Sequence, residues 1–484
     1  MQKTLAFIAV SLTYTCAHSQ LLLSNLLVDG DASPSAVPGS PTYRWGCTLP
    51  PCGPFQLTDA NPSNELLIVG NTYRTVAPGA FLKRRKAIRL DSNGNQHLIA
   101  EETMPIPGRT GSFGNIFNAR YMSEDAVAIL HEWKVDSQTS YRQITSAIGG
   151  VFTPIVEPGM TLTDGTLFPA QTDGIVIYSF EASHNRGALV AGNTDSGSTT
   201  PLTLYSVDTQ GVTRIAVSGG VDDVGLPIGQ IDPNNLVVSD SGIVVVEATG
   251  PAGQQFVVYD GQITRVLHRF DDLNSTDPTL ELHFLVGPTG AFDVSHDGRI
   301  CAIVSSQNDG VGADRLIEFS DSPPRIVYEP GATAPGGLGT ILRIDQARYT
   351  SNGRLVARVT RSHIGGVERD QVLTFRSNGE PYLLLEAYTD YPSFSTGALE
   401  WIELGADDSI GIYEYRSDYR IDLVTGAGLP CPADTNHDGI LTPSDFSAWV
   451  AAFNAQTAAC DQNGDAHCTP ADFSSWVTNY TSGC

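Results

Sequence analysis

Oxygen-bearing side chains recur at alternate positions in a short segment near the C-terminal end of the sequence. The segment contains Asp434, Asn436 and Asp438, followed by Gly439, Ile440 and, at the twelfth position, Asp445. Carboxylate and amide oxygens at positions one, three and five, a turn glycine at six, a backbone carbonyl at seven and a closing carboxylate at twelve supply the ligands that Ca²⁺ prefers. The spacing predicts a calcium-binding loop in which Ile440 contributes its backbone carbonyl oxygen.

A second segment repeats this pattern with one difference. Its candidate ligands are Asp461, Asn463, Asp465, His467 and Asp472. Ala466 stands where the first loop has its turn glycine, and a left-handed backbone conformation costs a residue with a Cβ roughly 1–2 kcal/mol. We therefore expect two calcium sites, the second weaker than the first.

Each loop is followed by apolar side chains at the spacing i, i+3, i+4, i+7. They are Phe446, Trp449, Val450 and Phe453 after the first loop, and Phe473, Trp476, Val477 and Tyr480 after the second. This spacing predicts two amphipathic helices whose apolar faces pack together. We expect these side chains to form the core of a small all-α module; the alternative is a surface that binds a partner.

Residues 430–484 resemble a type I dockerin, because two tandem loop-helix halves carry Asp rather than Glu at the twelfth loop position. Cys431 and the terminal Gly483–Cys484 make the segment similar to the GC-type dockerin found at the ends of exported bacterial proteins. The resemblance implies calcium-dependent folding and docking to a cohesin-like or cell-surface receptor. Pro443–Ser444 and Pro470–Ala471 differ from the recognition pair of cellulosomal dockerins.

The cysteines are grouped in a way that favours disulfides in an exported chain. Cys47 and Cys52 flank a tight turn. Three pairings are open to the four C-terminal cysteines, and we prefer Cys431–Cys484, which joins the ends of the module, and Cys460–Cys468, which closes the second loop. Cys301 lies in an apolar run, so we expect a buried free thiol.

Residues 1–19 have the layout of a secretory signal peptide, with Lys3, an apolar run over 5–12, and the small residues Ala17 and Ser19. The alternative is a buried first helix. No later stretch reaches the roughly 18 apolar residues of a membrane-spanning helix. We expect a protein without a membrane span that is secreted or associated with the bacterial cell surface.

The charge balance excludes one class of partner. The sequence has 28 basic and 53 acidic residues, for a formal net charge of -25. Nucleic acids and anionic membranes both attract cationic surfaces. We therefore expect no nucleic-acid partner.

Between residues 58 and 429 the sequence repeats a polar turn followed by a short run rich in Val and Ile. Seven copies begin at Asn64, Glu124, Asp173, Ser241, Asp297, Asn352 and Asp408, about 57 residues apart. A second series of turns alternates with them at 93–94, 149–150, 210–211, 260–261, 322–323 and 378–379. Asn-Gly and Asp-Gly pairs in these turns supply the positive φ of tight β-hairpins.

A unit of this length holds four short strands, so we predict a mainly β fold, a β-propeller of about seven blades. Residues 20–57 would be an N-terminal extension or a closing strand. The alternatives are an irregular pair of β-sandwiches or a β-solenoid. Loops with Pro-Gly, at 157–159 and 329–331, would lie on one face, where such scaffolds commonly bind their ligands.

Catalytic motifs of the zinc-protease, serine-hydrolase and phosphate-loop kinds do not occur in the sequence. The basic run 83–86 is interpreted as a solvated turn rather than an anionic-ligand patch, and His131–Glu132 as a strand pair. The favoured function is a non-catalytic propeller that recognises a protein or a glycan and is anchored by the dockerin-like module. The alternative is a dockerin-bearing glycoside hydrolase or polysaccharide lyase.

Overall fold

The structure is a computed structural model of the chain, which divides into two compact units, Leu23–Thr425 and Met1–Leu22 with Gly426–Cys484. It describes residues 22–28, 32–33, 43–45, 55–61, 63, 65–77, 80–91, 93–137, 139–169, 176–183, 186–193, 201–285, 292–305, 314–320, 322–335, 339–350, 353–362, 368–375, 381–386, 398–404, 410–415, 419–425, 433, 435, 443–457, 460, 462 and 468–482. The predicted signal peptide and the pairs Cys47–Cys52 and Cys431–Cys484 lie outside these residues. Within them, no helix has both the length and the apolar character to cross a membrane.

The unit Leu23–Thr425 consists mainly of β-strands, which form seven sheets in its described part. The first sheet contains β2 (Ala32–Ser33), β3 (Tyr43–Trp45), β4 (Phe55–Ala60), β5 (Leu66–Ala77), β6 (Ala80–Leu90) and β7 (Gln96–Glu101). The second contains β8 (Ser112–Tyr121), β9 (Ala126–Lys134), β10 (Ser140–Ile148) and β11 (Val151–Val156). The third contains β12 (Val176–Ser183), β13 (Arg186–Gly192), β14 (Thr203–Asp208) and β15 (Gly211–Val217).

The remaining four sheets continue in chain order. The fourth contains β16 (Gln230–Val238), β17 (Val244–Gly250), β18 (Gly253–Tyr259) and β19 (Thr264–Leu267), and helix α1 (Phe270–Thr276) follows it. The fifth contains β20 (Phe284–Leu285), β21 (Phe292–Val294), β22 (Ile300–Ser305), β23 (Asp314–Phe319) and β24 (Arg325–Tyr328). The sixth contains β25 (Ile341–Tyr349), β26 (Leu355–Ser362), β27 (Glu368–Phe375) and β28 (Pro381–Glu386). The last contains β29 (Ala398–Leu404), β30 (Ile410–Tyr415), β31 (Tyr419–Thr425) and β1 (Leu22–Val28).

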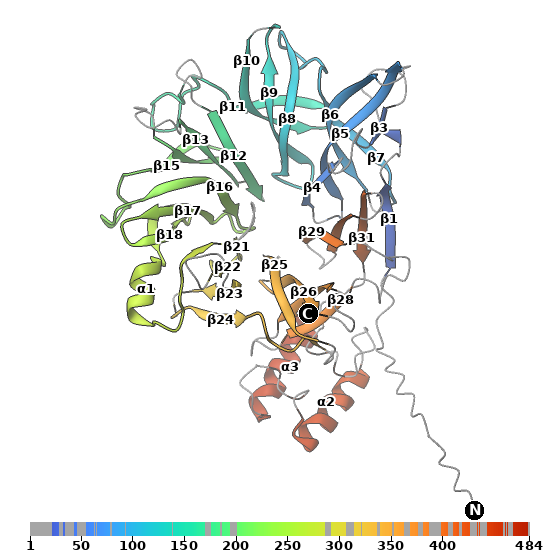
Figure 1. The fold of residues 1–484 in the computed structure, drawn as a ribbon, viewed down its shortest axis with the longest axis vertical. Helices are drawn as coiled ribbons and strands as arrows, with labels where there is room; N and C mark the ends of the chain where they lie inside the picture. The colour runs from blue at the N-terminus through green and yellow to red at the C-terminus, as the bar shows by residue number, and fades with distance from the viewer. Residues whose placement is uncertain are drawn as a thin grey trace, which may run out of the picture. The chain divides into compact units, whose positions relative to one another are not determined.

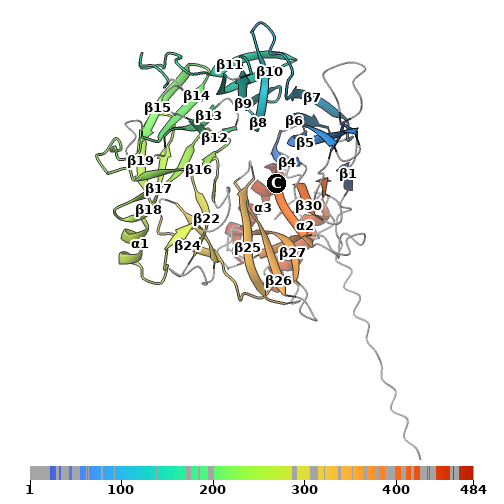
Figure 2. The same ribbon diagram turned by 45° about the horizontal axis from the view of Figure 1, so that its top comes forward.

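Most of these sheets are antiparallel meanders in which strands consecutive in the sequence are hydrogen-bonded neighbours. The first strands of successive sheets contact one another, β8 with β12 and β12 with β16, and consecutive sheets lie side by side in chain order (Figures 1 and 2). Strand β4 contacts both β8 and β29. The prediction of a mainly β, propeller-like fold is therefore confirmed.

Hydrogen bonds between neighbouring sheets recur at the spacing of the sequence repeat. The backbone N–H of Tyr121 donates to the carboxylate of Asp59, 62 residues earlier, at 2.7 Å. In the same way the backbone N–H of Tyr349 donates to Asp293, 56 residues earlier, at 2.7 Å. The two bonds join β4 to β8 and β21 to β25, which are strands of consecutive sheets, so the repeat in the sequence is a repeat of sheets.

Three of the four turn glycines of the first series occupy equivalent places in their sheets. Gly242, Gly298 and Gly353 each precede the second strand of a sheet and have φ of 83°, 90° and 74°. Gly174 lies outside the described residues, and the run after it is β12, the first strand of its sheet. Its assignment to the same series is wrong, because an Asp-Gly pair occurs in the segments between sheets as well as in hairpins.

Four of the segments that connect one sheet to the next share a backbone pattern. Each of the four closes a small loop with one isolated bridge, at Pro105–Ser112, Thr161–Leu167, Val221–Pro227 and Thr333–Thr340. In the third of these, Asp222 accepts from the backbone N–H of Val266 at 2.8 Å and Asp223 from that of Thr264 at 2.6 Å. These carboxylates satisfy donors on β19, the outer strand of the next sheet, which protects an exposed sheet edge.

Apolar side chains fill the space between the sheets. Phe256 on β18 packs against Phe292 and Phe319 of the next sheet, with ring centroids 5.2 and 5.4 Å away. Cys301 on β22 is 0% exposed and forms no disulfide. The predicted buried free thiol is thus confirmed.

The described part of the C-terminal unit contains two helices of equal length, α2 (Pro443–Ala455) and α3 (Pro470–Ser482). Each begins with proline, whose fixed φ suits the first helical position. Trp449 and Trp476 are each 5% exposed and form the core of the unit together with Ala433.

Candidate functional site

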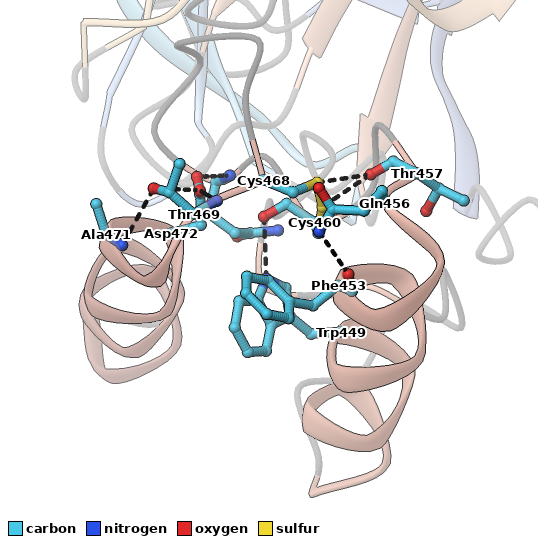
Figure 3. The surroundings of a disulfide bond; sticks show 10 residues. Trp449, Phe453, Gln456, Thr457, Cys460, Cys468, Thr469, Ala471 and Asp472 are labelled. Atoms are coloured by element: carbon cyan, nitrogen blue, oxygen red, sulfur yellow. Dashed lines mark hydrogen bonds between the residues drawn. A yellow bond between two sulfur atoms is a disulfide. The ribbon is translucent and has the colours of Figure 1, made fainter.

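The closing carboxylates of the two predicted calcium loops occupy equivalent positions. Asp445 lies in the first turn of α2 and Asp472 in the first turn of α3, and both are 0% exposed. Asp472 accepts from the backbone N–H of Gln462 at 2.8 Å and from that of Thr469 at 2.7 Å, and Figure 3 shows Thr469 beside it. A helix N-terminus favours a negative charge, but a carboxylate removed from water needs strong compensation.

The charge composition of this segment restricts what that compensation can be. Residues 426–484 contain six aspartates, two histidines and neither Lys nor Arg. A carboxylate oxygen that accepts one hydrogen bond still has a lone pair with which it can bind a metal ion, and carboxylate oxygens are ligands that Ca²⁺ prefers. The aspartates of this segment are therefore of a type that fits calcium.

Only the two closing aspartates of the predicted sites can be located. The other eight candidate ligands, Asp434, Asn436, Asp438, Ile440, Asp461, Asn463, Asp465 and His467, lie outside the described residues. Ala466 also lies outside them. Where the chain is described, no cluster of three or more metal-binding side chains occurs.

Each tryptophan of this unit is bonded to the residue that precedes the opposite loop. The indole N–H of Trp449 on α2 donates to the carbonyl of Cys460, just before the second loop, at 3.1 Å. The indole N–H of Trp476 on α3 donates to the carbonyl of Ala433, just before the first loop, at 3.1 Å. The helix of each half therefore fixes the start of the loop in the other half.

Because each tryptophan is bonded to the start of the opposite loop, we expect its replacement to change the calcium affinity of that opposite loop. Trp449→Phe should weaken the second site and Trp476→Phe the first, each about tenfold, because a buried carbonyl left without its donor costs roughly 1–3 kcal/mol. Calorimetric calcium titrations on chains that keep one loop, made by Asp445→Asn or Asp472→Asn, measure each site alone. Equal weakening of both sites by either variant would refute the crossed arrangement.

The disulfide Cys460–Cys468 forms as predicted, with Cα atoms 5.6 Å apart. Both sulfur atoms lie near the carbonyl oxygen of Thr457, at 2.9 and 3.2 Å (Figure 3). Thr457 follows the end of α2, so the disulfide holds Cys460, just before the second loop, and Cys468, its eighth residue, close to that helix.

The apolar helix faces are only partly buried. Trp449 and Trp476 are in the core, with Phe453 and Tyr480 packed against them. Phe446, Val450, Phe473 and Val477 are 39%, 37%, 43% and 38% exposed. The prediction that all eight side chains form the core is therefore wrong for these four, because the apolar stripe is wider than the seam between two short helices.

The basic run 83–86 belongs to strand β6, so its interpretation as a solvated turn is wrong. Lys86 is 0% exposed and its Nζ lies 3.8 Å from Glu101, to which Arg84 also donates at 2.8 Å. Burial lowers the pKa of Lys86 to about 8. Side chains of a strand alternate between its two faces. Four consecutive basic residues show no such alternation in the sequence, so the strand was not recognised.

His131 and Glu132 lie on β9, as expected of a strand pair. The His131 ring is 0% exposed, with Nε2 2.9 Å from the Thr145 hydroxyl and Nδ1 2.7 Å from the carbonyl of Glu132. Burial lowers the pKa of His131 to about 4. A neutral imidazole inside a sheet acts as a structural group.

Glu247 on β17, whose side chain is 3% exposed, was not predicted as a site residue from the sequence. It accepts from the amide of Asn235 at 2.6 Å and from that of Gln254. Asn235 follows Asp232 in an irregular stretch of β16 between Ile231 and Leu236. Burial raises the pKa of Glu247 to about 7, and the nearby charge of Asp232 acts in the same direction.

No family model and no curated protein matches this chain. Among solved structures, the β-propeller domain of the trilobed protease from Pyrococcus furiosus is similar at 9% identity and a TM-score of 0.37, over 63% of this chain and 80% of that one. The sialidase of Trypanosoma rangeli with the inhibitor DANA is similar at 10% identity and 0.37, over 73% and 60%. A xyloglucanase from Xanthomonas campestris is similar at 11% identity and 0.38, over 81% and 52%.

Proposed function

We propose that this chain is an exported calcium-binding protein in which a dockerin-like module anchors a non-catalytic β-propeller that recognises a protein or a glycan. The observation that carries the proposal is the pair of fully buried carboxylates, Asp445 and Asp472, in a segment that has no Lys or Arg. Two calcium ions would bring positive charge to these carboxylates, the first bound more tightly than the second. Export by the predicted signal peptide would bring the protein to a medium in which calcium and disulfides are both available.

For the larger unit we propose a closed propeller of seven blades, one per sheet. The contact between β4 and β29 supports closure, because it joins the first sheet of the unit to the last one. Strand β1 supports it further, since this N-terminal strand belongs to the sheet of β29, β30 and β31. A ring closed by strands from both ends of the unit leaves fewer free sheet edges.

For the module we propose docking to a cohesin-like or cell-surface receptor through the exposed half of its helix faces. Phe446 and Phe473 lie with ring centroids 5.8 Å apart, and Val450 and Val477 occupy matching positions on the two helices. Exposed apolar groups that adjoin a packed aromatic core are typical of a protein-binding surface.

A polysaccharide-active hydrolase or lyase is the second candidate function. Asn235 Nδ2 lies 2.6 Å from Glu247 and 3.5 Å from Asp232, so two carboxyl groups of different environment are close together. Such pairs perform acid and base catalysis on glycosidic bonds. The full chain should release no product from a panel of plant and bacterial polysaccharides; product release that Glu247→Gln abolishes would establish the enzyme instead.

Replacement of Ala466 by glycine should tighten the second calcium site about tenfold. Glycine adopts the left-handed turn freely, whereas alanine loses roughly 1–2 kcal/mol there. Calorimetry on the Asp445→Asn background isolates that site. If Ala466→Gly leaves its affinity unchanged, the second loop does not use the turn of an EF-hand.

A further inference from the structure

One glutamine side chain joins the fourth sheet to the fifth by two hydrogen bonds. Gln254 on β18 donates from its amide Nε2 to the carboxyl group of Glu247 on β17. Its amide Oε1 accepts from the backbone N–H of Leu285 on β20 at 2.7 Å. The carboxyl group of Glu247 is thus connected to a backbone donor of the next sheet through a single amide.

A second amide donor to Glu247 is held in its orientation by a negative charge. Asn235 Nδ2 lies 2.6 Å from Glu247 Oε2 and 3.5 Å from Asp232 Oδ2. If the Asn235 amide were reversed, its oxygen would face the carboxylate of Asp232, and two acceptors form no hydrogen bond with each other. Asn235 therefore keeps its N–H directed to Glu247 in either protonation state of that group.

The two protonation states of Glu247 place different demands on Gln254. An ionised carboxylate only accepts hydrogen bonds, so its two oxygens match the two amide donors. A protonated carboxyl group has an O–H, which needs an acceptor. Because Asp232 fixes the Asn235 amide, the amide oxygen of Gln254 is the acceptor at hand, and it faces Glu247 only after that amide reverses. The Nε2 of Gln254 then faces the backbone N–H of Leu285, and two donors form no hydrogen bond.

We propose that Glu247, Gln254 and the backbone of Leu285 form a pH-sensitive joint, in which deprotonated Glu247 lets Gln254 hold Leu285 and protonated Glu247 reverses the Gln254 amide and releases it. Burial raises the pKa of Glu247 to about 7, so the joint changes state in the neutral range. The inference does not depend on the proposed recognition and calcium-binding functions.

Other ionisable side chains lie on the segments around the joint. They are Asp232 on β16, His268 before α1, Asp271 on α1, His283 before β20 and Arg315 on β23. The charge of Asp232 acts on the pKa of Glu247 in the same direction as burial. Histidine is the side chain whose charge ordinarily changes near neutral pH, so His268 and His283 require control variants.

The test is hydrogen–deuterium exchange of the full chain at residue resolution, at about pH 5 and about pH 9, on either side of the titration of Glu247. The quantity compared is the protection factor of the Leu285 amide, which removes the intrinsic pH dependence of exchange, divided by that of the Ser295 amide. Ser295 donates to the carbonyl of Arg299 in the same sheet at 2.9 Å, without Gln254. We expect this ratio to be about fivefold higher at the higher pH, because a hydrogen bond contributes about 1 kcal/mol net.

Variants separate the joint from other causes. Glu247→Gln has an amide donor at both pH values, so Leu285 should show the low ratio at both. Gln254→Met lacks the amide and should give the same result. Gln255→Met is the matched control: the Gln255 amide donates to the carbonyl of Pro227 at 3.3 Å, and its loss should leave the pH response of Leu285 unchanged. His268→Asn and His283→Asn should also keep the response.

A ratio that is the same at both pH values in the natural sequence would overturn the proposal. So would a pH response that Glu247→Gln retains, because the proton would then belong to another group. Loss of the response in His268→Asn or His283→Asn would assign it to a histidine instead. If Gln254→Met does not fold, the result for Glu247→Gln decides alone, because glutamine has nearly the shape of glutamate.

Discussion

Chelation of calcium should unfold the unit that contains α2 and α3 while the sheets stay folded. Without calcium, the buried carboxylates of Asp445 and Asp472 lose their proposed counter-charge, and two short helices bury too little apolar surface to compensate. Each bound ion stabilises the folded state by about 2.7 kcal/mol when calcium stands at about 100 times its dissociation constant. The loss of folded structure in this unit is measured by near-ultraviolet circular dichroism, which reports on its packed tryptophans and their aromatic neighbours.

Variants separate this effect from general instability. Asp445→Asn and Asp472→Asn should each abolish part of the calcium-dependent signal, and the double variant all of it. Asp260→Asn, a substitution in the turn before β19, should change nothing in the calcium response. A spectrum that EDTA leaves unaltered, with the disulfide Cys460–Cys468 reduced, would show that calcium does not stabilise this unit.

Glu247→Gln should make the stability of the larger unit less dependent on pH. Burial raises the pKa of Glu247 from its ordinary 4.5 to about 7, so the folded chain holds this proton more tightly than the unfolded chain does. Between those values the unfolded state has already lost the proton, and stability falls as the pH rises. The stabilisation is complete below about pH 4.5 and is lost through about pH 7; the shift corresponds to about 3 kcal/mol.

The measurement is the difference in unfolding free energy between Glu247→Gln and the natural sequence at pH 4 and at pH 8. We expect this difference to become more favourable to the variant by about 3 kcal/mol over that range, because glutamine carries no charge to bury. Glu318→Gln is the opposing control. Glu318 pairs with Arg299 and Arg325, both at 2.9 Å, so its replacement should destabilise the chain at pH 8. A difference for Glu247→Gln that does not vary with pH would contradict the high pKa.

Short-range patterns in the sequence predicted the elements of both units well. The Asn-Gly and Asp-Gly turns at 93–94 and 260–261 lie between the last two strands of their sheets, β6 with β7 and β18 with β19, because tight hairpins depend on the residues inside the turn. The apolar spacing around Trp449 and Trp476 predicted two helices that pack together. The disulfide Cys460–Cys468 followed from the position of its cysteines around one loop.

Features that depend on contacts between sheets could not be predicted in this way. The run 83–86 appeared as a solvated turn, since nothing in four consecutive basic residues shows which faces another sheet. Glu102 contacts both Arg85 and Lys134, although Lys134 is far from both in the sequence. Gly114 was the available signal: a glycine inside a strand often marks the close approach of a neighbour.

The exposed half of the helix faces was misjudged for a related reason. Periodicity tells which side chains share a face, but the width of the buried seam depends on how closely the partner helix approaches. Phe446 and Phe473 contact each other and the tryptophans; the ring centroids of Phe446 and Trp476 are 5.2 Å apart. Both phenylalanine side chains nevertheless remain partly exposed.

The most direct test of the proposed calcium-dependent module is the number of calcium ions bound per chain, measured by native mass spectrometry after dialysis against dilute calcium. We predict two ions for the natural sequence, one for Asp445→Asn, one for Asp472→Asn and none for the double variant. No bound calcium in the natural sequence, or two ions retained by the double variant, would contradict the account.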